Sequence, residues 1–496
     1  MAAKSPCTLA FTSHPQRQRP ALSGNTAALP PKAFMTLLSR TRELAESFLD
    51  NVDSRPVFPT ATFQELVQAL GGPLPEGPED PQTVIESFAA AVDPGLVATP
   101  GPRYFGFVTG GSVPAAVAAE WLTAAWDQNA GLHVLSPASA AVEHVAAGWL
   151  LQLLGLPSSA SVGFVTGATV ANTTALAAAR HEVLRRSGWD VEADGLQGAP
   201  RITVIAGQQA HASIRNATRF IGLGSAGIIY ADADGQGRML PASLERALAS
   251  SSGPTIVCAQ AGNVNTGAFD PLDVITPLVH DRGGWLHVDG AFGLWAAVSK
   301  SLAHHLRGVA AADSWTVDGH KWLNVPYDSG FVIVAHPAAH RAAMSQTAEY
   351  LLRGGETERE GQDWTPEASR RARGNPVYAA IKSLGRSGME GMIDRCCACA
   401  RVMADTLAAE PGIEVLNDVV LNQVLVRFRS TAGANITPRV IGRIQQDRIC
   451  WAGGTQWQGE PALRISISGW KTSEQDARTS ATAMIAAQRQ SGGEGD

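Results

Sequence analysis

Three features are scarce in this chain of 496 residues: cysteine, long apolar runs and dense blocks of basic residues. The six cysteines are too few and too irregularly spaced for a disulfide framework, which favours a reducing compartment and predicts a cytoplasmic protein. No charge-free apolar run reaches the ~18 residues of a membrane span, so we expect no membrane partner. The formal net charge of −6, with no Lys/Arg block, argues against a nucleic-acid partner and favours small molecules and a second copy of the chain.

The closely spaced cysteines Cys396, Cys397 and Cys399 do not predict a metal site. A zinc site usually combines a CxxC pair with two further cysteine or histidine ligands. This segment contains no CxxC pair and no nearby histidine. We therefore expect the three cysteines to pack on a helix face, and we predict no metal.

Apolar residues are plentiful, at 45% of the chain against 17% charged residues, which is typical of a globular protein with buried sheets. The length suits two domains, or one large α/β unit with a smaller one attached. Residues 1–33 are rich in Ser and Pro and contain no acidic residue. They lack a secretory apolar core and a clear amphipathic Arg helix, so we predict a disordered leader rather than a transit peptide.

Residues 34–100 are predicted to form a helical arm. Apolar side chains recur at helical spacing from Phe34 to Phe48, and a second short helix is expected at 83–92, after a connector rich in Gly and Pro. An amphipathic helix ahead of the main body needs an apolar partner. We expect the second subunit of a homodimer to provide it.

From about Tyr104, β-prone runs alternate with helices rich in Ala and Leu. This alternation predicts a large domain at 101–385 with a mostly parallel sheet covered on both faces, and ligands at the carboxyl ends of the strands. The charged segment 350–375 has the length of a lid or a binding loop. A smaller α+β domain is expected at 386–490, followed by a solvated tail at 491–496.

A single lysine, Lys321, lies between two apolar runs in the segment SWTVDGHKWLNVPYDSGFVIV at 314–334. Burial between strands would remove the hydration of its amine, lower its pKa and favour the neutral nucleophile that Schiff-base chemistry needs. The alternative is an ordinary lysine that buries its stem and keeps its ammonium in water.

Three further segments place unusual residues at predicted strand ends. Thr166 to Thr169, before an Ala-rich helix, suits either a phosphate at a helix N-terminus or a plain cap. His211 suits either capping or stacking on a flat ring. Asp289 suits a turn or the binding of a buried cation, since a carboxylate buried alone is costly.

Pyridoxal phosphate offers a group for each of these residues: a phosphate, an aromatic ring with a nitrogen, and an aldehyde. A carboxylate ~4 Å from the protonated ring nitrogen is worth on the order of 4 kcal/mol at an effective dielectric of ~20. That corresponds to about three pKa units, which keeps the ring a strong electron acceptor. The sequence therefore predicts pyridoxal phosphate as the cofactor.

Five runs occur in order within 102–468: TGATVANTTALAAAR, QAH, GNVNTGAFDP, HVDGAFG and DGHKWLNVPYDSG. Together they closely resemble the group II pyridoxal-phosphate-dependent amino-acid decarboxylases, which include the glutamate and aromatic L-amino-acid decarboxylases. The resemblance implies the aspartate-aminotransferase-like (type I) fold with a smaller C-terminal α+β domain. It also implies an L-amino-acid substrate and a homodimer with the active site at the subunit interface.

The resemblance implies roles for individual residues as well. Lys321 is expected to form the internal aldimine, with His320 beside it on the phosphate and substrate side and His211 stacked on the ring. The other cofactor positions are expected to be the phosphate-binding Ala168 and Thr169, the ring-nitrogen partner Asp289, Ala291 against the ring, and Asn263. The substrate pocket is expected to include Phe107, Thr109 and Arg464, with Arg464 meeting a substrate carboxylate.

The implied reaction is decarboxylation of an L-amino acid to the amine, through the Lys321 aldimine and a quinonoid. The family places a Tyr on a loop just before the segment that reads QDWTPEASRRARGNP here, but residues 360–363 are Glu, Gly, Gln and Asp. Within the family, loss of that Tyr accompanies other outcomes, including decarboxylation coupled to oxidative deamination. An aldehyde-forming enzyme or a carbon–carbon lyase is therefore an alternative, as is a non-catalytic scaffold or regulator. The side chain of the substrate, acidic or aromatic, stays open.

Overall fold

A seven-stranded sheet forms the centre of the large domain, in the order β1-β7-β6-β5-β4-β2-β3. The structure, a computed structural model, describes residues 31–346 and 358–492. Strand β7 runs antiparallel to both of its neighbours, and the other pairs are parallel. The strands are β1 (Ser161–Val165), β2 (Thr203–Gly207), β3 (Ile229–Ala231), β4 (Thr255–Gln260), β5 (Trp285–Asp289), β6 (Ser314–Asp318) and β7 (Gly330–Val334). The predicted mostly parallel sheet is confirmed.

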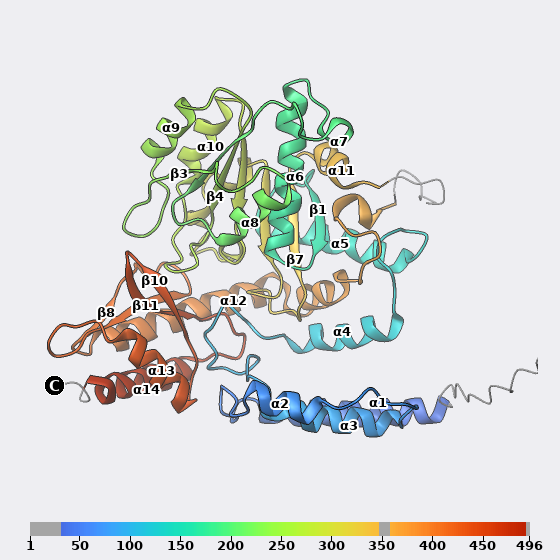
Figure 1. Cartoon of the computed structure of the whole chain (residues 1–496), viewed down its shortest axis with the longest axis vertical. Helices are drawn as coiled ribbons and strands as arrows, with labels where there is room; N and C mark the ends of the chain where they lie inside the picture. Colours follow the sequence, from blue (N-terminus) through green and yellow to red (C-terminus); the bar gives the residue numbers. More distant parts are fainter. Residues whose placement is uncertain (1–30, 347–357, 493–496) are drawn as a thin grey trace, which may run out of the picture.

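Helices cover both faces of this sheet, as Figure 1 shows. Two separate apolar clusters, one on each face, fill the space between the sheet and the helices. Because helices cover both sides, every residue of β1, β4, β5, β6 and β7 is buried, which explains their continuous apolar character. One face carries α6 (Ala168–Arg186), α8 (Ala212–Phe220) and α11 (Pro337–Met344); the other carries α5 (Pro137–Leu154), α9 (Pro241–Ala249) and α10 (Leu272–His280).

The long helix α12 (Gly374–Ala408) leads from the large domain into the small one. At Gly385 its φ is 61° and its ψ is 177°, so two helical segments meet there at a kink. The predicted domain boundary at 385/386 falls at this kink and stays a prediction. The small domain contains a four-stranded sheet in the order β10-β11-β9-β8 and two further helices. These elements are β8 (Ile413–Val415), β9 (Gln423–Phe428), β10 (Gly453–Trp457), β11 (Glu460–Ser466), α13 (Thr437–Asp447) and α14 (Glu474–Gly492).

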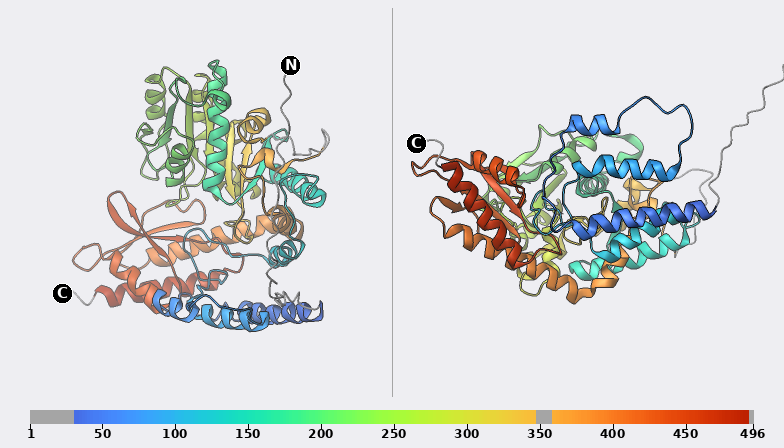
Figure 2. Two further views of the ribbon diagram at one scale, coloured as in Figure 1. Left: turned by 45° about the vertical axis from the view of Figure 1, so that its right-hand side comes forward. Right: turned by 90° about the horizontal axis from the view of Figure 1, so that it is seen from below.

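The N-terminal helices lie along one side of the molecule, below α4 (Pro114–Trp126) and beside the small domain in Figure 1, and again at the edge of the body in Figure 2. They are α1 (Pro31–Asn51), α2 (Phe63–Leu70) and α3 (Pro81–Val92), and neither α2 nor α3 buries any residue. In the ranges 31–346 and 358–492, no helix is long and apolar enough to cross a membrane. Most of the predicted leader, Tyr350 and the last four residues of the tail lie outside the described residues.

The kink in α12 yields a test of backbone strain. The conformation of Gly385 is one that essentially only glycine adopts, so Gly385→Ala is expected to destabilise the protein by about 1–3 kcal/mol. An added Cβ would meet nothing within 4 Å, so a clash is not the cause. The midpoint of urea unfolding measures the effect. The control is Gly391→Ala in the same helix, where φ is not positive and a Cβ also meets nothing. Equal effects in the two variants would contradict the interpretation.

Candidate active site

A cavity of about 110 Å³ lies at the carboxyl ends of the central strands. Its walls come from the loop at 107–108, from the segments after β2, β4, β5 and β6, and from β11 of the small domain. The structure thus brings together residues that are far apart in the sequence. The predicted site residues on its wall are Phe107, His211, Asp289, Ala291, Lys321 and Arg464.

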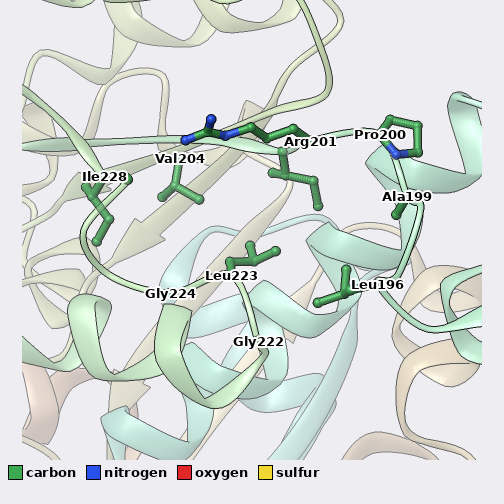
Figure 3. A pocket seen from close by; sticks show the side chains of 11 residues that line it. Leu196, Ala199, Pro200, Arg201, Val204, Gly222, Leu223, Gly224 and Ile228 are labelled. Atoms are coloured by element: carbon green, nitrogen blue, oxygen red, sulfur yellow. The ribbon is translucent and has the colours of Figure 1, made fainter.

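A larger hollow, of about 250 Å³, lies between residues 196–204 and 222–228. Figure 3 shows that its labelled side chains are aliphatic apart from Arg201. A single arginine provides neither a nucleophile nor an acid–base pair, so this hollow lacks the groups that catalysis needs. The smaller cavity around Lys321 is the candidate active site.

The amine of Lys321 is paired with a carboxylate that the sequence analysis did not single out. Lys321 Nζ lies 2.9 Å from Asp318 Oδ2, and the two side chains are 18% and 2% exposed. Asp318 Oδ2 also lies 3.6 Å from His320 Nε2. Asp318 is thus an anionic partner that holds the amine in position inside the site. The only signal in the sequence was an acid at the end of an apolar run, three residues before the lysine.

Asp289, the last residue of β5, is fixed by a network of neutral donors. Its Oδ2 accepts hydrogen bonds from Asn172 Nδ2 at 3.1 Å and Ser213 Oγ at 3.4 Å, and its Oδ1 accepts one from the Ala291 backbone N–H at 3.1 Å. Asn172 Oδ1 in turn lies 2.8 Å from His287 Nε2. None of these donors is a cation, so the network leaves Asp289 open to a cationic partner in the cavity. Neither Asn172 nor Ser213 was predicted from the sequence.

His211 combines the two predicted alternatives. It is the N-cap of α8, where its Nδ1 accepts a hydrogen bond from the Ser213 backbone N–H at 3.3 Å, and its ring also lines the cavity. Burial lowers the pKa of His211, and Asp289 opposes the shift only in part. The ring is therefore neutral near pH 7, and its flat face is available for packing against an aromatic ligand.

The start of α6 suits a phosphate. The helix begins at Ala168, and its N-cap Gly167 offers no side-chain hydrogen bond to the first turn. Backbone N–H groups at such a terminus attract anions. A Cβ on Gly167 would lie 3.1 Å from His320 Cε1, so a larger residue there would require the His320 ring to shift slightly. Thr169 is exposed on this first turn.

The substrate side of the cavity contains one cation without a protein partner. Among the residues that the structure describes, the guanidinium of Arg464 has no hydrogen-bond or ion-pair partner, whereas its backbone pairs within the small sheet. Burial lowers the pKa of this guanidinium. Phe107 and Val108 adopt left-handed backbone conformations, with φ of 53° and 58°. In this conformation the Phe107 ring stacks on that of Trp451, with centroids 5.6 Å apart. A free guanidinium beside an aromatic wall can bind a carboxylate.

Asn263 lies near the cavity but does not line it. Its Oδ1 accepts hydrogen bonds from the backbone N–H groups of Asn265 and Thr266, and its Nδ2 donates to the Gln209 carbonyl at 3.4 Å. The side chain is thus used within its own turn. The predicted contact of Asn263 with the cofactor stays a prediction.

The cysteine cluster packs as a helix face. Cys396, Cys397 and Cys399 are buried on α12, and burial raises the pKa of each thiol. Across the described part of the chain, no group of three or more His, Cys, Asp or Glu side chains is arranged to hold a metal ion.

His287 provides a pH-dependent test of the network around Asp289. Burial lowers its pKa from 6.5 to about 4, so between these values the unfolded chain binds a proton that the folded chain does not. The free energy of unfolding should therefore fall by about 1.4 kcal/mol per unit as pH drops through this window. In His287→Gln this slope should be shallower by that amount, as measured by urea unfolding of the cofactor-free protein. Replacing the exposed His144 by Gln should leave the slope unchanged, and equal slopes in His287→Gln and wild type would refute the assignment.

Comparison with known proteins points to one family. A family model described as "Pyridoxal-dependent decarboxylase conserved domain" matches residues 64–430. Tryptophan decarboxylase 1 of Oryza sativa subsp. japonica is 28% identical over 417 residues, which cover 80% of this chain and 80% of the relative. Phenylacetaldehyde synthase of a Rosa hybrid cultivar is 25% identical over 442 residues, 86% of this chain and 85% of the relative. A crystal structure of Oryza sativa TDC with PLP and tryptamine superposes with a TM-score of 0.87 at 24% identity, covering 93% of this chain and 99% of that one.

The cavity wall has three of the groups that pyridoxal phosphate requires: an amine, a carboxylate and a flat neutral ring. The uncapped N-terminus of α6, which suits the phosphate, does not line the cavity but lies beside His320, the neighbour of Lys321. The structural likeness confirms the predicted type I fold, and the family match confirms the predicted cofactor and the predicted decarboxylase activity. The scaffold alternative is set aside. The chain belongs to the pyridoxal-dependent decarboxylase family, and it is an enzyme that uses pyridoxal phosphate.

Proposed function

We propose that this enzyme converts an L-amino acid into the corresponding amine and carbon dioxide in the cavity around Lys321. One observation supports the proposal above all: the Lys321 amine, the Asp289 carboxylate and the unpartnered Arg464 guanidinium line the same small cavity. When bound, pyridoxal phosphate supplies an aldehyde for the amine and a ring that accepts electrons. The chain supplies the groups that hold it and orient the substrate.

Each predicted residue has a place in this proposal. With pyridoxal phosphate bound, Lys321 would hold its aldehyde and Asp289 would favour protonation of its ring nitrogen. Arg464 binds a substrate carboxylate beside Phe107, and Thr109 supports this wall from a buried position. The remaining assignments are His211 and Ala291 on the faces of the ring, Ala168 and Thr169 at the phosphate, His320 between phosphate and substrate, and Asn263 at the edge of the site.

An aldehyde-forming reaction is the second candidate, because residues 360–363 lack the tyrosine that the family has on this loop. The segment before Trp364 forms a short 3₁₀ helix, η5 (Gly361–Trp364), whose Asp363 is buried and lies 3.4 Å from Arg341. A relative of this chain is a phenylacetaldehyde synthase. In that branch the amino acid, dioxygen and water would give the aldehyde, carbon dioxide, ammonia and hydrogen peroxide. A screen of acidic and aromatic L-amino acids that follows amine, ammonia and peroxide separates the two reactions and identifies the substrate.

The enzyme is proposed to act as a homodimer with the active site at the interface. The support is the arm at 34–100, which presents large apolar side chains to solvent in the single chain. On α2, Phe63, Val67 and Leu70 are 75%, 47% and 52% exposed and share one helix face. A stable monomer rarely leaves such a face uncovered, so a second copy is the proposed occupant.

A cytoplasmic location is proposed from the thiols. Five cysteines lie within the described residues, and all five are free and buried. Free thiols persist in a reducing compartment.

Replacing Lys321 tests the proposed chemistry. Lys321→Ala should lose the visible absorption band of the lysine-bound cofactor and should form no amine, because Lys321 provides the only amine on the cavity wall within the described part of the chain. Absorption spectroscopy of the purified protein with added pyridoxal phosphate measures the first effect, and a carbon dioxide assay measures the second. The control is Lys382→Ala, which removes an amine that lies over Trp149 instead. A wild-type protein without the band would refute the proposal.

The dimer is tested on α2. The double variant Phe63→Asp, Val67→Asp should shift the protein from dimer to monomer in sedimentation-velocity experiments, because burying two carboxylates at an apolar interface is costly. Gln68→Glu, on the opposite side of the same helix, should leave the dimer intact. A wild-type protein that sediments as a monomer at micromolar concentration would contradict the assignment.

A further inference from the structure

The proposed reaction needs an acid, because a proton must replace the carboxylate on the α-carbon of the substrate. Tyrosine is suited to this step, and the chain contains five. Tyr350 lies outside the described residues. The ring of Tyr378 stacks on that of Trp149, with centroids 5.0 Å apart, and Tyr230 is 48% exposed on β3. The ring of Tyr104 stacks on that of Trp451, with centroids 5.1 Å apart, and burial raises the pKa of its hydroxyl to about 12. The fourth tyrosine that the structure describes is Tyr327.

Tyr327 touches two of the predicted site residues. Its ring stacks on that of His320, with centroids 4.4 Å apart and planes 28° apart. Its hydroxyl lies 3.4 Å from Thr109 Oγ1. His320 directly precedes Lys321, and both reach Asp318, at 3.6 and 2.9 Å. Tyr327 is thus connected to Lys321 through His320, which stacks on the tyrosine ring and shares Asp318 with the lysine.

The surrounding turn fixes the position of this tyrosine. The next residue, Asp328, is paired with Arg373 at 2.7 Å. The carbonyl of Ser329 accepts hydrogen bonds from the backbone N–H groups of Gly319 and His320, at 3.1 and 3.2 Å. The turn after β6 is therefore tied back on the residues that precede Lys321. Such bonds hold a side chain in position without help from a mobile loop.

The Tyr327 hydroxyl can also exchange its proton. The side chain is 62% exposed in the single chain, although one face of its ring is covered by His320. Water can therefore reach the oxygen. Thr109, which is buried, can donate a hydrogen bond to the oxygen once its proton has left, and this bond stabilises the anion.

We propose that Tyr327 is the acid that protonates the α-carbon, a proposal that rests on the decarboxylase function proposed above. The bond between the α-carbon and the carboxylate breaks and carbon dioxide leaves. The electron pair of that bond then forms a C–H bond with the phenolic proton of Tyr327. The phenolate takes a proton from water, so the balance is amino acid plus one proton to amine plus carbon dioxide. No oxidant takes part.

The test is Tyr327→Phe, which keeps the ring stacked on His320 and removes the hydroxyl. The kcat for amine formation should fall by about 100-fold or more, while KM stays within a few-fold. The Kd for pyridoxal phosphate and the visible band of the bound cofactor should be unchanged, because the proposed role begins after cofactor binding. Tyr104→Phe, a neighbouring phenol stacked on Trp451 instead, is the matched control and should keep its kcat.

The outcomes are distinct. A wild-type kcat in Tyr327→Phe, an equal loss in Tyr104→Phe, or a loss of cofactor binding in Tyr327→Phe would each overturn the role of Tyr327 as the acid. A wild-type enzyme that binds the cofactor but forms no amine from any amino acid would instead overturn the proposed function. The predicted fall in kcat with unchanged cofactor affinity supports both.

Discussion

The ion pair between Lys321 and Asp318 is the interaction around which the active site is arranged. A charged group removed from water is stable only beside an opposite charge. The Asp318 side chain is 2% exposed, and its Oδ2 lies 2.9 Å from Lys321 Nζ. The last residue of the buried strand β6 carries this carboxylate, and the turn that follows carries the amine. The pair therefore fixes the amine at the carboxyl edge of the sheet, where the cavity opens.

The other groups of the site are fixed by strand ends and helix starts in the same way. Asn172 on α6 connects His287 inside β5 with Asp289 at the end of that strand, and Ser213 on α8 completes the set. Three elements are thus tied to one carboxylate. All these partners of Asp289 are neutral. A cofactor with a cationic ring nitrogen and an aldehyde can therefore bind to Asp289 at the nitrogen and to the Lys321 amine at the aldehyde.

Residues at predicted strand ends could be identified from the sequence, because ligands gather there in parallel sheets. Lys321, His211 and Asp289 were found in this way, and all three line the cavity. Asn172, Ser213 and Asp318 were not, since their importance depends on contacts between distant segments or on a hydrogen bond that a pattern does not encode. Asn263 was expected at the cofactor, but its side chain is used within a turn.

The fold shows the same division. The two apolar runs predicted on either side of Lys321 are the buried strands β6 and β7, whereas the edge strand β10 was not predicted. That strand contains Gly453 and Gly454, has a single β-branched residue, Thr455, and alternates between partly buried and exposed positions before its last residue, so no apolar run reveals it. The helix α2 was likewise missed, since its apolar face lies uncovered in the single chain.

The most direct test of this account is to identify the lysine that holds the cofactor. The chain contains six lysines, and the structure places only Lys321 on the wall of the cavity among those it describes. Borohydride reduction of the purified holoenzyme, followed by proteolysis and mass spectrometry, locates the modified residue. The account predicts a pyridoxyl group on the peptide that contains Lys321, at about one per chain. A pyridoxyl group on another lysine, or none on any, would contradict it.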